Sequence, residues 1–177
     1  MKKSMIALAL VCASVLMAGE IKIDWSKAKV GDKTIPGWAL DKYGKVEDLG
    51  TASIEKGSKE GTFAFALKGN KLRTAYYMTA PTKVKIGDVI KYTYRVKGTG
   101  KYVIGFFCYD KVSFVAKAKG HMKDMTAPAE WQTVTQEIEI QQPYDADRSV
   151  TMIRPQIASL PDCSVVIEDL KIEHIAK

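Results

Sequence analysis

The sequence has few of the residues on which enzyme active sites most often depend. It contains only two histidines, His121 and His174, and three cysteines in 177 residues. None of the motifs Cys-x-x-Cys, His-Glu-x-x-His, Gly-x-Ser-x-Gly or a phosphate-binding glycine loop occurs in it. A glycoside hydrolase needs two carboxylates at a fixed separation, whereas Glu137 and Glu139 alternate with isoleucines and indicate a solvated strand face. We therefore expect that the protein is not an enzyme.

Apolar runs long enough to cross a membrane are also missing. The longest, Met5–Met17, follows two lysines and is shorter than the roughly 18 residues that a membrane helix needs. The small residues Ala18-Gly19 come next, and this order is typical of a secretory signal peptide. We predict a signal peptide at 1–19 and a single domain at 20–177. The protein would then be secreted or periplasmic, with no membrane span after cleavage.

Arginine is scarce. The formal net charge is +7, but most of the 27 basic residues are lysines, spread along the chain among 20 acids. A nucleic-acid binder usually gathers its basic residues on one face and uses more arginine. We therefore expect no nucleic-acid partner and interpret the charge as a solvated surface.

Two cysteines, Cys108 and Cys163, follow the predicted signal peptide. An exported chain can form a disulfide. However, Cys108 lies in an apolar strand and Cys163 in a predicted loop, and sequence spacing does not set the distance between two sulfur atoms. The sequence leaves open whether these residues form a disulfide or remain free thiols.

No stretch has the period of an amphipathic helix, and there are no internal repeats or low-complexity segments. Instead, short runs rich in aromatic and β-branched residues alternate with polar residues, and turns separate them. The predicted strands are Ile21–Trp25, Thr51–Glu55, Thr62–Lys68, Lys71–Thr79, Gly87–Lys97, Lys101–Asp110, Trp131–Gln141, Ser149–Ile157 and Ser164–His174. Pro155 predicts an edge or bulged position for its strand. This pattern is typical of an all-β sandwich or barrel.

The stretch Gly87–Lys97 has the clearest pattern. Four residues of one parity, Ile90, Tyr92, Tyr94 and Val96, are apolar or aromatic, and the residues between them are polar or basic. We expect a central strand with these four side chains in the core. The next strand, Lys101–Asp110, is expected to return beside it as a hairpin after Gly98-Thr99-Gly100.

The order of motifs resembles the galactose-binding-like jelly rolls, above all the carbohydrate-binding modules of bacterial xylanases and glucanases. The matching stretches span nearly all of the chain after the predicted signal peptide: Ile35-Pro36-Gly37-Trp38, Gly61–Leu67, Gly87–Lys97, Trp131 with the strand after it, and Ile167-Glu168-Asp169-Leu170. The resemblance implies a two-sheet antiparallel β-sandwich that binds sugar. Many members carry a structural calcium, for which Glu168 and Asp169 are the candidate ligands. They stand where the family usually has two aspartates, and the alternative is one exposed acid and one paired near a sheet edge.

Sugar binding would use aromatic faces and planar polar groups that the core does not need. On the two later strands, Phe107, Tyr109, Arg154 and Gln156 have the outward parity, and Arg95 has it on the central strand. These five residues are expected to line one concave sheet surface, with glycine at position 105 leaving open space beside Phe107. A second core layer under a loop is the alternative for Phe107 and Tyr109. Tyr77 is a further candidate for stacking on a sugar.

We therefore predict a secreted, non-catalytic carbohydrate-binding module that recognises a poly- or oligosaccharide. One alternative is an exported structural or protein-interaction domain that binds a protein of the cell envelope. The other is a carbohydrate-active enzyme with an unrecognised site. Beyond the candidate calcium, the sequence predicts no cofactor.

Overall fold

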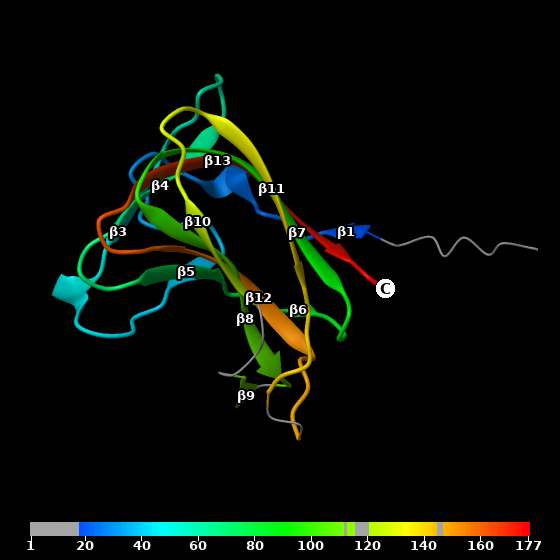
Figure 1. Ribbon diagram of the computed structural model, residues 1–177. Helices are drawn as coiled ribbons and strands as arrows, with labels where there is room; N and C mark the ends of the chain where they lie inside the picture. Colours follow the sequence, from blue (N-terminus) through cyan, green and yellow to red (C-terminus); the bar gives the residue numbers. More distant parts are fainter. Residues whose placement is uncertain (1–17, 112, 116–120, 145–146) are drawn as a thin grey trace, which may run out of the picture.

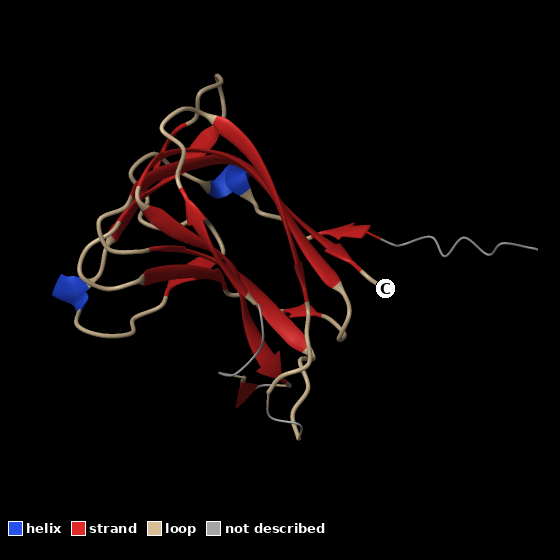
Figure 2. Cartoon of the chain, in the orientation of Figure 1, coloured by secondary structure: helices blue, strands red, loops and turns tan. Residues whose placement is uncertain are grey.

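The structure is a computed structural model that describes residues 18–177 except 112, 116–120 and 145–146. Apart from its last two residues, the predicted signal peptide lies outside the described residues. Figure 2 shows that the described chain consists almost wholly of strands and loops, with two short 3-10 helices at Trp25–Lys27 and Val46–Asp48. The predicted fold class is confirmed, because the strands form two antiparallel sheets that enclose a common core as in a jelly-roll sandwich.

The first sheet has six strands. In it β11, β7, β13, β4 and β3 lie side by side in that order, and β1 pairs with the far end of β13 (Figure 1). The strands are β1 (Ala18–Glu20), β3 (Thr51–Lys56), β4 (Phe63–Lys68), β7 (Val89–Thr99), β11 (Gln132–Glu139) and β13 (Ser164–Ile175).

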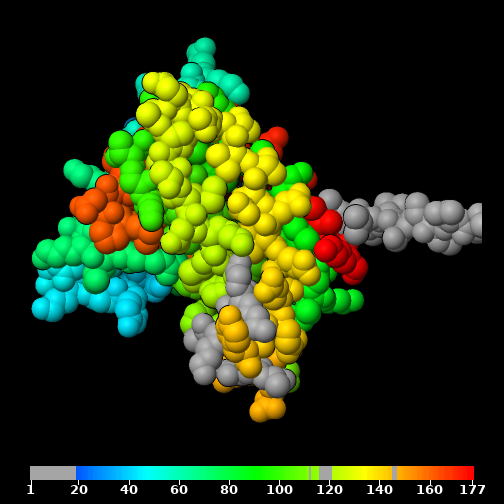
Figure 3. Space-filling view, viewed as in Figure 1, coloured from blue at the N-terminus to red at the C-terminus, as the bar shows by residue number. Residues whose placement is uncertain are grey.

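The second sheet has seven strands. Here β10, β8, β12, β5 and β2 follow one another, β6 pairs with β12, and β9 pairs with β8. The strands are β2 (Trp38–Leu40), β5 (Thr74–Met78), β6 (Thr82–Lys83), β8 (Lys101–Asp110), β9 (Ser113–Phe114), β10 (Met122–Thr126) and β12 (Met152–Ser159). Strands β10 and β11, yellow-green and yellow, lie on the face turned toward the viewer in Figure 3.

The central position of β7 is confirmed. The strand is flanked by β11 and β13, and its inward residues Ile90, Tyr92, Tyr94 and Val96 are fully buried. Each such side chain removed from water stabilises the fold by about 1.5–3 kcal/mol. This strand is therefore a principal part of the core.

The predicted hairpin of β7 with β8 is wrong. Both edges of β7 are occupied by β11 and β13, so β8 crosses to the second sheet and faces β7 across the core. The hydroxyls of Tyr94 and Tyr102 lie 3.0 Å apart, and their rings pack edge to face at 6.3 Å. Gly98 allows the crossing, because it has a φ of +148° and a Cβ there would lie 2.1 Å from the Ser164 carbonyl oxygen.

A bulge in β13 divides the edge of that strand. Asp169 has a φ of +53°, and the register of β13 against β7 shifts between Glu168 and Lys171. Strand β4 pairs with β13 only as far as Glu168, and β1 pairs only from Glu173 onward. The first sheet therefore has an opening between β4 and β1.

Candidate functional site

The outer face of the second sheet gathers five of the six predicted ligand-binding residues. Side chains alternate along a strand, and Phe107 and Tyr109 of β8 lie outside the main core, in a second cluster. Strand β12 places Arg154 opposite Phe107, and Gln156 opposite both Gly105 of β8 and Tyr77 of β5. With one neighbour from β9, the surface consists of Tyr77, Phe107, Tyr109, Phe114, Arg154 and Gln156, and we call it the aromatic face.

The rings of the aromatic face pack edge to face on one another. The Phe107 centroid lies 5.5 Å from that of Tyr77 and 5.8 Å from that of Phe114. Phe107 is only 7% exposed and packs with buried aliphatic residues, so it forms the second core layer that the sequence left as an alternative. Phe114, which the sequence did not single out, is 46% exposed and presents apolar surface beside Tyr109, at 5.8 Å between centroids.

Arg154 lies against two of these rings. Its guanidinium carbon is 5.1 Å from the ring centroid of Tyr109 and 5.8 Å from that of Tyr77, which are cation–π distances. Burial raises the pKa of Tyr109, and the nearby Arg154 charge partly offsets that rise. The two rings hold a planar cation in a defined orientation at the surface.

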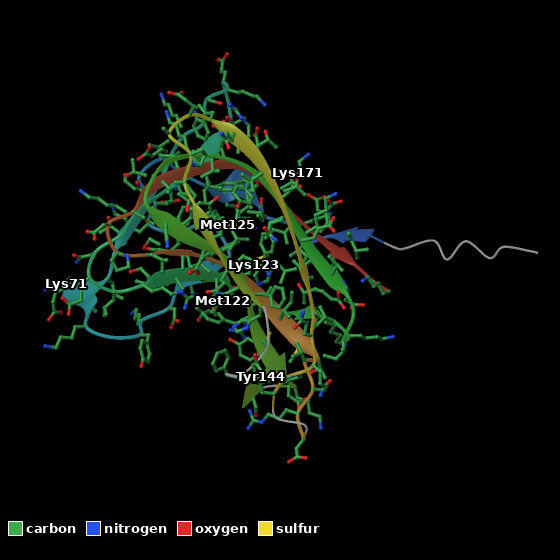
Figure 4. All side chains as sticks on the ribbon, viewed as in Figure 1. Lys71, Met122, Lys123, Met125, Tyr144 and Lys171 are labelled. Carbon is green, nitrogen blue, oxygen red and sulfur yellow. The ribbon has the colours of Figure 1, made fainter. Side chains whose placement is uncertain are left out.

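A second arginine, Arg73, reaches the same face from the segment before β5. Its Nη2 atom donates a hydrogen bond of 2.7 Å to Gln156 Oε1 and lies 3.3 Å from the sulfur of Met122 on β10. Figure 4 labels Met122. Burial lowers the pKa of Arg73, and the charges of Asp41 and Asp124 act in the opposite direction. Sequence reasoning missed Arg73 because it stands outside the regular alternation of the strand.

Three nitrogen atoms of this cluster are buried without a hydrogen-bond partner among the described residues. They are Nε of Arg73, Nε of Arg154 and Nε2 of Gln156. The Gln156 side chain is fully buried, and its oxygen already accepts the bond from Arg73. All three nitrogens are hydrogen-bond donors.

The expected open space at Gly105 is wrong. A Cβ at this position would lie 2.2 Å from the His121 carbonyl oxygen and 2.9 Å from Met122 Cα. Strand β10 pairs with β8 at this point, with Met122 opposite Gly105. The glycine permits the close approach of β10 and leaves no room beside Phe107.

Arg95 does not belong to the aromatic face, contrary to expectation. It lies on β7, in the other sheet, and pairs with the carboxylate of Glu168 and, at 3.0 Å, with the hydroxyl of Ser58. The guanidinium carbon also lies 5.1 Å from the ring centroid of Trp131. Arg95 does point out of the core, as its parity predicted. However, the outer face of the first sheet is on the opposite side of the sandwich from the aromatic face.

The two candidate calcium ligands do not offer a calcium site. The Glu168 carboxylate accepts bonds from the Ser58 N–H at 2.8 Å and the Ser58 hydroxyl at 2.6 Å, besides pairing with Arg95. Asp169 pairs with Lys59 at 3.3 Å. Within the described ranges, no group of three or more acidic, histidine or cysteine side chains could hold a metal ion. These carboxylates are therefore neutralised by cationic side chains, and a calcium ion does not fit the donor set.

The opening between β4 and β1 contains a cavity of about 660 Å³. Trp25 and Phe63 contribute an aromatic wall, their rings nearly parallel and 6.5 Å apart between centroids. Arg95, Lys171 and Asp169 are among the charged residues that line it. Lys171, labelled in Figure 4, follows the bulge on β13. This cavity combines apolar and charged surface, and the sequence gave no indication of it.

Both cysteines that the sequence left open are buried free thiols. Burial raises the pKa of Cys108 to about 12 and also raises that of Cys163. The described residues include no helix long and apolar enough to cross a membrane.

No protein-family model matches the sequence, and a search of curated proteins finds no similar one. Among solved structures, the cyclase Fisc from Fischerella sp. TAU, in complex with (3Z)-3-(1-methyl-2-pyrrolidinylidene)-3H-indole, has a TM-score of 0.59 at 10% identity, covering 91% of this chain and 100% of the cyclase. A CBM4 structure has a TM-score of 0.47 at 14% identity, and the match covers 77% of this chain and 86% of that structure. The CBM22-1 xylan-binding domain from Paenibacillus barcinonensis has a TM-score of 0.46 at 9% identity, and the match covers 85% of this chain and 99% of that domain. The jelly-roll fold that the sequence resemblance implied is confirmed by the two antiparallel sheets and their common core.

The expectation that the protein is not an enzyme is overturned by the cyclase. That enzyme shares the fold over its full length, so the sandwich itself can carry an active site. The missing catalytic motifs exclude only the chemistries that those motifs serve. At 10% identity the similarity establishes the fold and leaves the reaction and substrate undefined.

Proposed function

We propose that the protein is exported and binds a poly- or oligosaccharide on its aromatic face. The observation that carries this proposal is the position of Arg154 against the rings of Tyr77 and Tyr109, at 5.8 and 5.1 Å. Proteins recognise sugars with aromatic rings that cover apolar ring faces and with planar groups that bond to the oxygens. The aromatic face offers both kinds of contact side by side, and Phe114 adds exposed apolar surface.

Export is part of the proposal. The basic, apolar and small residues of 1–19 are those of a signal peptide, and a polysaccharide ligand would be met outside the cytoplasm. The partner we propose is therefore a cell-wall or environmental polysaccharide.

Native affinity electrophoresis of the processed protein tests the binding. The gels contain xylan, β-glucan, mannan, pectin or no polysaccharide, and retardation in at least one of the four is expected. A Tyr109→Ala variant should lose the retardation. An Ile86→Ala variant is the matched control, since Ile86 is exposed in the turn before β7, on the other sheet. Chromatography of each polysaccharide after incubation shows whether the bound sugar is also cleaved.

Unchanged mobility in all gels would reject sugar binding and favour the alternative, an exported domain whose partner is an envelope protein. Retardation that survives in Tyr109→Ala would reject the aromatic face as the binding surface.

A second candidate function is chemistry on a small amphipathic molecule in the cavity between β1 and β4. The observation that favours it is the cavity itself, where the near-parallel rings of Trp25 and Phe63 lie close to the ion pair of Asp169 with Lys59. The structurally similar cyclase binds an indole compound, and a stacked aromatic wall suits a flat ring.

Indole is the probe for this second candidate, and amide NMR shifts are the readout. Saturable shifts at Thr93 and Lys171, which line the cavity, are expected, and Phe63→Ala should weaken them. If indole leaves these resonances unmoved, the cavity is not a site for flat aromatic ligands.

A further inference from the structure

The charge of Arg154 on the aromatic face indicates what kind of sugar the face takes. The guanidinium lies against the rings of Tyr77 and Tyr109, and no carboxylate among the described residues pairs with it. From this we propose that the ligand is an acidic sugar whose carboxylate binds beside Arg154, that is, a uronic-acid polysaccharide. The inference rests on the proposed function, since it concerns the ligand of the same face.

Donors and acceptors are not equivalent for a sugar. A hydroxyl both donates and accepts, so a site for neutral sugars usually offers the two kinds of group together. A carboxylate only accepts, and its two oxygens can take several N–H bonds at once.

The charge of Arg154 is unusual among the three arginines described in detail. Arg95 pairs with Glu168, and Arg73 lies in the field of Asp41 and Asp124. Arg154 has no carboxylate partner in the described part of the chain, and its neighbours are two aromatic rings. The aromatic face therefore presents a guanidinium whose charge an anionic ligand can balance.

The geometry favours a carboxylate over a rounder anion. A guanidinium is planar and forms two parallel N–H bonds to the two oxygens of a carboxylate. The rings of Tyr77 and Tyr109 restrain the orientation of the Arg154 plane, so less side-chain freedom is lost on binding. A uronic acid brings such a carboxylate on a sugar ring, whose apolar face can cover the exposed Phe114.

The test compares unesterified polygalacturonate with the same polymer fully methyl-esterified, in buffer with chelator so that calcium does not gel the polymer. Esterification removes the charge and keeps the backbone. Affinity electrophoresis or calorimetry should show binding to the free acid that is at least about tenfold stronger than to the ester, the range of one charge-assisted bond. Polyglutamate and dextran sulfate are included because the protein is basic and binds polyanions through charge alone.

Three variants locate the carboxylate. Arg154→Met should abolish the preference for the free acid, and Arg154→Lys should restore part of the affinity because it keeps the charge without the planar fork. Lys97→Met is the control, because it removes one positive charge from an exposed position on the other sheet. Thermal melting of each variant shows whether it is folded. If Arg154→Met is unfolded, the affinity of Arg154→Lys for the free acid and for the ester is the test of the inference.

The outcomes separate the two proposals. Binding to xylan, β-glucan or mannan without binding to polygalacturonate would overturn the acidic-sugar inference and leave sugar binding intact. Equal affinity for the free acid and the ester, or for polygalacturonate and polyglutamate, would overturn it as well. Binding to no polysaccharide at all would overturn the proposed function itself.

Discussion

The Nε2 atom of His174 lies 2.7 Å from Oδ2 of Asp88 and joins the end of β13 to the turn before β7. The same carboxylate accepts bonds from the backbone N–H groups of Lys85, at 2.8 Å, and Lys177, at 3.2 Å. Asp88 is nearly fully buried. One carboxylate therefore fastens the carboxyl-terminal residues to the central strand of the first sheet.

This contact makes stability depend on pH. Burial opposes ionisation of Asp88, but the bonds from His174 and the two N–H groups outweigh it and hold the pKa of Asp88 below its usual value. The ionised group therefore stabilises the fold at pH values above about 4, the ordinary pKa of an aspartate. That contribution declines as the pH falls through the lower folded-state pKa. Asp88→Asn should cost about 1–3 kcal/mol at neutral pH, and the difference from wild type should shrink in acid.

Urea unfolding at several pH values between 7 and 2.5 measures both effects. Asp147→Asn is the control, because Asp147 is exposed and carries the same change of charge. A gap between wild type and Asp88→Asn that stays constant down to pH 2.5 would contradict this account of the carboxylate.

Gly105 gives a second prediction. Because a Cβ there would approach the His121 carbonyl oxygen to 2.2 Å, Gly105→Ala should push β10 away from β8. We expect a loss of about 1–3 kcal/mol of unfolding free energy, the usual cost of overpacking. Thermal melting measures it, with Ser164→Ala at an exposed position as the control. A Gly105→Ala variant as stable as wild type would show that β10 does not approach this closely.

Alternation within strands predicted the aromatic face well. Phe107 and Tyr109 share the outward parity of β8, and Arg154 and Gln156 share that of β12. This succeeds because side-chain direction follows from strand geometry alone, with a period of two residues. Parity does not tell to which sheet a strand belongs, and for that reason Arg95 was assigned to the wrong surface.

Features that depend on pairing between distant segments could not be predicted. Strand β10 has the sequence Met-Lys-Asp-Met-Thr, which lacks an apolar alternation, and its partner β8 determines that it is extended. Phe114 and Arg73 join the site from a two-residue strand and an irregular segment. The cavity results from a bulge at Asp169, a residue that the sequence does not mark for positive φ.

Pro155 shows how tertiary pairing overrides a local rule. It predicted an edge or bulged strand, yet β12 is central, between β8 and β5. Strand β12 pairs with β5 from Gln156 onward and with β6 up to Ile153. Pro155 falls between these two stretches, where neither β5 nor β6 pairs with β12. The missing backbone N–H of proline therefore removes no hydrogen bond to these strands.

The pairing of Arg95 with Glu168 supplies a third prediction. Arg95→Met would leave a carboxylate that is 1% exposed with only its bonds to Ser58. We expect a loss of about 1–3 kcal/mol in unfolding free energy, and the double variant Arg95→Met/Glu168→Gln should recover part of it because the uncompensated charge is gone. Chemical denaturation measures the changes, and polysaccharide binding should be unaffected, since Arg95 is on the other sheet. Loss of polysaccharide binding in a folded Arg95→Met variant would show that Arg95 does contribute to the binding surface.

The last prediction concerns the two thiols. Cys108 and Cys163 are both buried and free, and burial raises the pKa of Cys108 to about 12, so almost no thiolate is present at pH 8. The thiolate is the form that reacts with disulfide reagents, and a buried sulfur also excludes the reagent sterically. In the processed protein, a chromogenic disulfide reagent should therefore detect no thiol in the native state and two after unfolding in denaturant without reductant. Finding none after unfolding would mean that export has oxidised the pair to a disulfide, and β8 and the loop before β13 would then have to bring the two sulfur atoms within bonding distance.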